Sequence, residues 1–84
     1  MTQSEHIAWT KERALQELHY EGNGSEAKRI AAALTSVCSD IQKDGVVNEG
    51  TARTIIELGT LEVMAGTVGT VEQMERWIKG IEGG

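Results

Sequence analysis

The chain has 84 residues and a net charge of −5, from 13 acidic and 8 basic residues. A chain of this length forms one domain and buries only about 60% of the surface that it exposes when unfolded. An acidic surface argues against unaided binding to a phosphate backbone, because that affinity comes from counterions displaced by Lys and Arg. We therefore expect no direct nucleic-acid binding, whereas a basic protein partner is compatible with the charge.

Cys38 is the one cysteine, so an intrachain disulfide is excluded and nothing indicates secretion. The opening residues MTQSEH lack the basic and apolar regions of a signal peptide. No run reaches the roughly 18 apolar residues that a membrane span requires. The sequence therefore predicts a cytoplasmic protein with no membrane partner.

The first predicted helix covers about residues 4–20. Thr2 and Glu5 have the spacing of a capping box, with Ser4 as a competing cap. Helical spacing places an apolar stripe on one side of this helix, formed by Ile7, Ala14, Leu15 and Leu18.

The opposite side of this helix, which we call the Trp9 stripe, consists of Trp9, Arg13, Gln16 and Tyr20. An amphipathic helix normally exposes such a side, and aromatics beside Arg are typical of binding hot spots. We therefore predict an interaction site on this stripe, and a homodimer in which the stripe meets its own copy. The alternative is that a second helix covers this side and makes Trp9 a core residue.

The second predicted helix covers residues 26–44, with Ser25 as its N-cap and Gly45 as its stop. Its apolar positions recur at helical spacing: Ala27, Ile30, Leu34, Val37, Cys38 and Ile41. Because Cys38 lies on this apolar stripe, a buried and unreactive thiol is expected.

The third predicted helix, residues 51–65, is apolar in nearly every direction, with Ile55, Ile56, Leu58, Leu61, Val63 and Met64. A helix of this kind is usually surrounded by neighbours, so we predict that it is the central one. Gly59 lowers its helix propensity by roughly 1 kcal/mol relative to Ala. That cost indicates a close helix crossing at Gly59.

The last predicted helix, residues 71–81, follows a second capping-box match between Thr70 and Gln73. Its apolar face consists of Val71, Met74, Trp77, Ile78 and Ile81. With no strand pattern or repeat, the predicted fold is all-α, a compact bundle of three to four helices in a single domain, residues 1–84. A helix-turn-helix role is disfavoured, because segment 70–81 sets two acidic residues against Arg76 and Lys79.

No catalytic site, metal site or cofactor is predicted. His6 and His19 lie too far apart along one helix to share an ion, and no histidine is near Cys38 in the sequence to activate it. Segment 22–25 could hold an anion before the second helix. It lacks the GK[ST] ending of a phosphate-binding loop, so an ordinary loop with an N-cap is favoured.

Several motifs resemble a family of small accessory proteins of tailed bacteriophages. They are HIAW and KERAL at 6–9 and 11–15, IELG at 56–59, and a C-terminal segment with Thr70, Glu72, Met74, Ile78 and Gly80. Thr10 replaces a frequent Cys of the family, and residues 71–73 depart from its PEE-like cap. The resemblance implies a phage accessory protein acting in the bacterial cytoplasm, and it brings no catalytic residues with it.

The leading hypothesis is a non-enzymatic protein that binds and modulates a host protein, such as a component of antiviral defence. It depends on the acidic surface, the compact helical build and the phage resemblance. One alternative is an oligomer that sequesters a small ligand such as a nucleotide, suggested by the segment 22–25. Another is a structural or assembly component of the virion.

Overall fold

The computed structural model describes residues 1–82, and over that range the chain forms four α-helices and no strand. These helices are α1 (Gln3–His19), α2 (Glu26–Ile41), α3 (Glu49–Ala65) and α4 (Val71–Lys79). Two short 3₁₀ turns, Glu21–Asn23 and Lys43–Gly45, connect α1 to α2 and α2 to α3. The predicted all-α helical bundle is confirmed.

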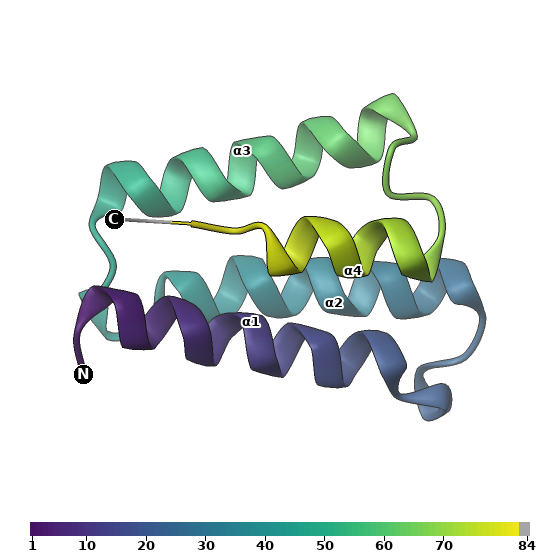
Figure 1. Ribbon diagram of the computed structural model, residues 1–84, viewed down its shortest axis with the longest axis horizontal. Coiled ribbons are helices and arrows are strands. Elements are labelled where there is room, and N and C mark those ends of the chain that lie inside the picture. Colours follow the sequence, from purple (N-terminus) through teal and green to yellow (C-terminus); the bar gives the residue numbers. More distant parts are fainter. Residues whose placement is uncertain (83–84) are drawn as a thin grey trace.

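The four helices run alternately in opposite directions, so that each short connection reverses the chain (Figure 1). α1 and α2 form the most extensive helix–helix contact of the molecule. In the view of Figure 1, α4 lies between α1 and α3, and α3 forms one edge of the bundle. α2 contacts α1, α3 and α4.

Both predicted capping boxes are present. Thr2 Oγ1 accepts a hydrogen bond from Glu5 N at 3.1 Å, and Glu5 Oε1 accepts one from Thr2 N at 3.0 Å. Thr70 and Gln73 exchange the same pair of bonds at the start of α4, at 3.1 and 3.2 Å. Each box satisfies two backbone N–H groups that the first turn of a helix leaves without a partner.

The central helices differ from their predicted ends. α3 begins at Glu49 because Asn48 Oδ1 accepts from the Gly50 and Thr51 N–H groups, a cap that the sequence analysis missed. α2 ends at Ile41, three residues before the predicted end. Two consecutive left-handed residues, Asp44 (φ 60°) and Gly45 (φ 63°), stop the helical backbone here; Asp tolerates this conformation better than most residues.

The core is aliphatic and draws on all four helices. Its buried members are Ile7, Ala14, Leu18, Ile30, Ala33, Val37, Ile41, Val47, Ala52, Ile55, Val68, Met74, Ile78 and Ile81. Of the predicted stripe on α1, only Leu15 is half-buried instead of buried. Every buried side-chain N or O atom in residues 1–82 has a hydrogen-bond partner.

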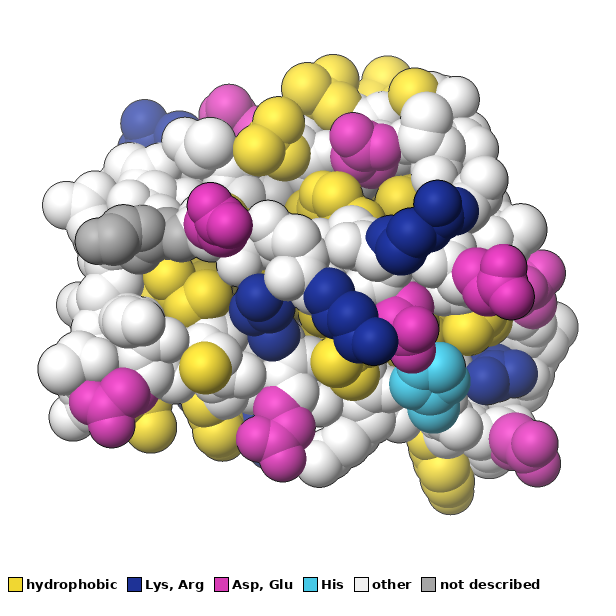
Figure 2. Space-filling view, in the orientation of Figure 1, with side chains coloured by type: hydrophobic (Ala, Val, Ile, Leu, Met, Phe, Trp, Pro, Cys, Tyr) yellow, Lys and Arg dark blue, Asp and Glu magenta, His cyan; other side chains and the backbone are white. Residues whose placement is uncertain are grey.

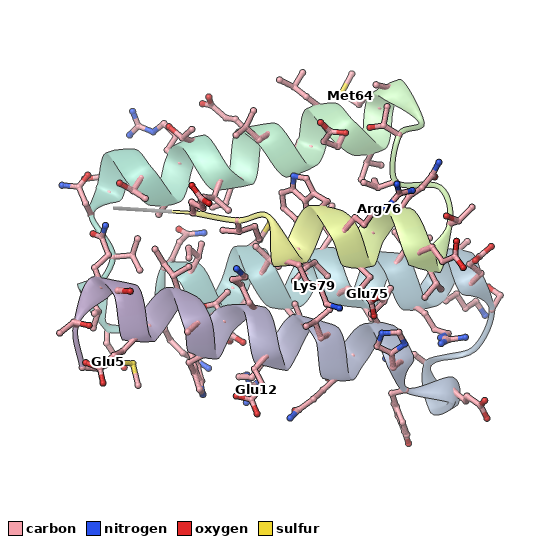
Figure 3. The ribbon with its side chains drawn as sticks, in the orientation of Figure 1. Glu5, Glu12, Met64, Glu75, Arg76 and Lys79 are labelled. Atoms are coloured by element: carbon pink, nitrogen blue, oxygen red, sulfur yellow. The ribbon has the colours of Figure 1, made fainter. Side chains whose placement is uncertain are left out.

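The C-terminal end of α4 is fixed to α1 by polar contacts. Lys11 Nζ donates to the backbone carbonyls of Lys79 and Ile81 at 2.7 and 3.1 Å. About two turns further along α1, His19 Nε2 lies 2.5 Å from Glu75 Oε1, and Glu75 points from α4 toward α1 in Figure 3. These contacts align the two helices along most of the length of α4.

The prediction that the third helix is central was wrong. α3 buries Ala52, Ile55 and Gly59, whereas its Leu58, Leu61, Val63 and Met64 side chains are 49%, 59%, 45% and 78% exposed. α2 is the helix that packs against all three others, and α4 buries its Met74 and Ile78 side chains fully. Helical periodicity reports which faces are apolar, but it does not report whether the same chain covers them.

At Gly59 the predicted close approach takes the form of side-chain packing. A Cβ atom on Gly59 would lie 2.8 Å from the Trp77 ring and 3.0 Å from Leu34 Cδ1. Gly59 therefore leaves room for a side chain of α4 and a side chain of α2 against the buried face of α3.

Candidate functional site

The Trp9 side of α1 meets the C-terminal end of α2 around a buried carboxylate, Asp40. Its side chain is only 3% exposed, and Arg13 Nε donates to Asp40 Oδ2 at 2.6 Å. Lys43 Nζ lies 3.5 Å from the other carboxylate oxygen, and Ser36 Oγ donates to Oδ2 at 3.4 Å. A buried charge needs such partners, because removing it from water is costly. Asp40 therefore links α1 to α2, the two helices with the most extensive contact in the molecule.

Trp9 lies over this ion pair and is half-buried. The Arg13 guanidinium carbon is 5.0 Å from the Trp9 ring centroid and Lys43 Nζ is 5.7 Å from it, both within cation–π range. The His6 ring packs against Trp9 at 5.1 Å between centroids. Its Nε2 is 2.7 Å from the Asp40 backbone carbonyl, and since a carbonyl only accepts, His6 Nε2 is the donor.

Trp9, Arg13 and Gln16 of the Trp9 stripe lie on α1, and Tyr20 is the C-cap residue directly after it; the four residues have different surroundings. The structure brings Trp9 and Arg13 together at Asp40. At this end of the stripe, Trp9 is half-buried, so it is neither fully exposed nor part of the buried core. Gln16 is exposed further along the helix. Tyr20 is 61% exposed at the opposite end, where its ring packs over Gly22. An interaction role for this stripe stays a prediction.

Sequence reasoning missed Asp40 and His6. Asp40 follows Val37 by three residues and precedes Ile41 directly, so it lies beside the apolar stripe of α2. That position could have marked it as a carboxylate needing a cation from a neighbouring helix. Thr10 is also buried, and its Oγ1 donates to the His6 carbonyl at 2.9 Å. Because this hydroxyl has a partner within α1, it can be buried without losing its hydrogen bond.

The groups of the described residues that bear on catalysis are the Cys38 thiol and the side chains that could bind a metal ion. Cys38 is half-buried, not fully buried as expected, and burial raises the pKa of its thiol, which favours the unreactive protonated form. Within residues 1–82, no three His, Cys, Asp or Glu side chains converge in a way that could hold a metal ion. None of the helices in this part of the chain is long and apolar enough to cross a membrane.

A second candidate site is the outer surface of α3, where three large apolar side chains follow one another at three-residue steps. We call Leu58, Leu61 and Met64 the α3 ridge; all three are about half exposed or more. Figure 2 shows hydrophobic side chains along α3 and in the hollow between α3 and α4. Met64 points away from the bundle in Figure 3.

Two hollows lie on either side of α3, and Leu58 is the ridge residue that lines one of them. The hollow toward α4 is lined by Ile55, Leu58, Arg76, Trp77, Gly80, Ile81 and Glu82. The groove toward α2 is lined only by small and apolar residues, namely Ala27, Ile30, Ala31, Leu34, Val63, Val68 and Gly69. The sequence analysis identified the apolar residues of α3 correctly but assigned them to the core.

No protein-family model, no curated protein and no solved structure matches this chain. The resemblance to phage accessory proteins stays a prediction.

Proposed function

We propose that this protein is a non-enzymatic, phage-type accessory protein that acts by binding a host protein, for example a component of antiviral defence. The observation that supports this proposal is the exposed α3 ridge together with the apolar hollows beside it. Contiguous apolar surface of this kind on a small protein marks an interaction site more often than a single exposed side chain does.

The ridge is also held in place before any partner arrives. Asn48 caps the first turn of α3, and Gly59 allows its middle to pack closely against Trp77 and Leu34. A left-handed Gly66 (φ 74°) ends the helix, and its N–H bonds back to the last turn. A preformed helix loses little conformational entropy on binding, which favours affinity.

Capture from bacterial lysate tests this proposal. The tagged wild type is compared with a Leu61→Ser/Met64→Ser variant and with a Thr35→Ala/Ser39→Ala control, which changes two exposed residues of α2. We expect a specific protein to be captured by the wild type and by the control but lost from the ridge variant. Capture of the same proteins by all three, or of no specific protein, would contradict the proposal.

Self-association through the Trp9 stripe is a separate part of the proposal. Gln16 and Tyr20 are exposed along the stripe, and Trp9 keeps part of its ring accessible. Full burial of a Trp side chain contributes on the order of 2–3 kcal/mol, so Trp9→Ala should weaken a dimer and leave the helices formed. Light scattering at micromolar concentration measures this. A monomeric wild type whose Trp9→Ala variant unfolds would instead assign Trp9 to packing against Asp40 and its partners.

A small-ligand binder is the second candidate, and one observation favours it. Trp9 offers a ring on which a nucleobase could stack, with the cations of Arg13 and Lys43 beside it for a phosphate. Asp40 already engages both cations, which places this candidate behind the first. Calorimetry against a panel of nucleotides separates the two, because a protein-binding role predicts no heat.

A further inference from the structure

The α3 ridge is bracketed by carboxylates. Glu57 precedes Leu61 by four residues and Glu62 follows Leu58 by four residues, so each lies beside the ridge one helical turn away. Glu57 is exposed, and Glu62 is half-buried and accepts a hydrogen bond from the Thr67 hydroxyl. An apolar ridge between two acidic side chains is the complement of an apolar stripe between basic ones.

The cations near the ridge do not cancel this charge. The one basic residue of α3 is Arg53, and its guanidinium lies 3.4 Å from Glu49 Oε1. Arg76 of α4 borders the hollow that contains Glu62, and Glu82 adds a third carboxylate at the hollow beside Leu58. Glu62 and Glu82 therefore lie near Arg76, and Glu57 lines a hollow with Glu49 and Arg53. These four carboxylates outnumber the two cations beside them.

This charge distribution favours one occupant over a second copy of the chain. A second α3 would bring another Glu57 and Glu62 to the same seam, and its Arg53 would already be engaged with Glu49. Like charges brought together at an interface oppose association, whereas a basic partner would pair with them. The length of the ridge, from Leu58 to Met64, covers about two helical turns, which suits the apolar stripe of one partner helix.

We propose, building on the protein-binding function above, that the α3 ridge binds an amphipathic helix of the partner whose apolar stripe is flanked by Lys or Arg. The partner's apolar side chains fill the hollows on either side of α3, and its cations meet Glu57 and Glu62. Met64, at the open end of the ridge, is unbranched and flexible and can adapt to the shape of the incoming helix.

Three synthetic helical peptides test this proposal. They share one leucine stripe and differ only in the flanking residues, which are Lys, Gln or Glu. Binding to the full-length protein is measured by fluorescence anisotropy at low and high salt. We expect the Lys peptide to bind at least about tenfold more tightly than the Glu peptide, with the Gln peptide between them, and the difference to shrink at high salt.

Two variants locate the site. Leu61→Ser/Met64→Ser should weaken the Lys peptide by about tenfold or more, since it removes apolar contact area. Glu57→Lys/Glu62→Lys should reverse the preference toward the Glu peptide. The matched control is Glu12→Lys/Glu21→Lys, which changes the net charge equally at exposed positions of α1 and the first 3₁₀ turn and should leave the preference unchanged.

The outcomes separate the two proposals. Equal binding of all three peptides, or an equal effect of the control, would overturn the basic-partner inference and leave the ridge as an interaction surface. Sedimentation showing a dimer that Leu61→Ser abolishes would assign the ridge to a second copy and also overturn it. Failure of every peptide, together with loss of lysate capture by the ridge variant, would overturn the helix-docking mode but not the protein-binding function.

Discussion

The α1–α2 pair and α3 contain similar proportions of apolar side chains but use them in opposite ways. α1 and α2 are joined by a buried ion pair, two cations on Trp9 and a continuous aliphatic seam. α3 contacts the bundle through a narrow strip around Gly59 and exposes its large side chains. The comparison shows that this small domain concentrates its helix–helix contacts in one pair of helices and leaves the large apolar side chains of another helix exposed.

Among the changes considered, loss of the Asp40 carboxylate should lower the free energy of unfolding the most. We expect Asp40→Ala to lower the free energy of unfolding by about 2 kcal/mol. This is less than for a fully buried pair, because Arg13 and Lys43 are half-exposed and can return to water. Urea unfolding followed by circular dichroism measures it. The exposed substitution Glu12→Ala serves as the control, and a loss no larger than the control's would mean that Asp40 does not anchor the pair.

The attachment of α3 should be the next most sensitive point. Gly59→Val should destabilise the fold by about 1–2 kcal/mol, because the new side chain meets the Trp77 ring and Leu34. The neighbouring Thr60→Val, on the exposed side of α3, introduces the same residue without that overlap. Thermal unfolding of both variants decides the matter: equal melting temperatures would show that the packing at Gly59 is loose.

Breaking the cap at the start of α4 should have a smaller effect on stability. Thr70→Ala should cost about 1 kcal/mol, because the Gln73 N–H loses its acceptor and the capping box is broken. Thr54→Ala, within an exposed turn of α3, should be neutral or slightly stabilising, since Ala has the higher helix propensity. Chemical unfolding of both proteins gives the difference in stability. Equal stability would show that the Thr70 cap does not stabilise α4.

The contact between α1 and α4 should give the smallest effect, visible in its pH dependence. The hydrogen bond from His19, aided by Lys79 nearby, holds the pKa of Glu75 below its ordinary range. A carboxyl whose pKa is lowered by folding stabilises the folded state above its unfolded pKa, and this contribution is lost as the pH falls through the folded pKa. The wild type should therefore exceed Glu75→Gln in melting temperature near neutral pH, and the gap should close in acid.

The matching control for this pH series is Glu12→Gln on the exposed side of α1 (Figure 3). A gap between wild type and Glu75→Gln that stays constant from neutral pH to below the glutamate pKa of about 4.3 would contradict the assignment.

Features that depend on neighbouring residues in the sequence could be predicted. The capping boxes at Thr2 and Thr70 follow from local spacing, and both are present. The cost of glycine in a helix indicated close packing at Gly59, where the Trp77 and Leu34 side chains lie. The all-α class follows from the helical period of the apolar residues in the same way.

Features that depend on which helices meet could not be predicted from spacing alone. Asp40 and Arg13 are 27 residues apart, and only the packing of α2 on α1 brings them together. The apolar faces of α3 were visible in the sequence, yet nothing local indicates that α2 packs against the other three helices and that α3 keeps its large apolar side chains exposed. The candidate site on α3 could therefore be identified only from the packing of the other helices, which determines the side chains of α3 that are exposed.

The bonds from Lys11 to the carbonyls of Lys79 and Ile81 have a consequence for synthesis on the ribosome. They join positions 68 and 70 residues apart, so this contact cannot form until Ile81 has been made. α1 and α2 can associate much earlier, about 40 residues before that point. The nascent protein should therefore pass through a two-helix stage whose surface for α4 is uncovered, and the synthesis of α4 sets the moment at which the bundle closes.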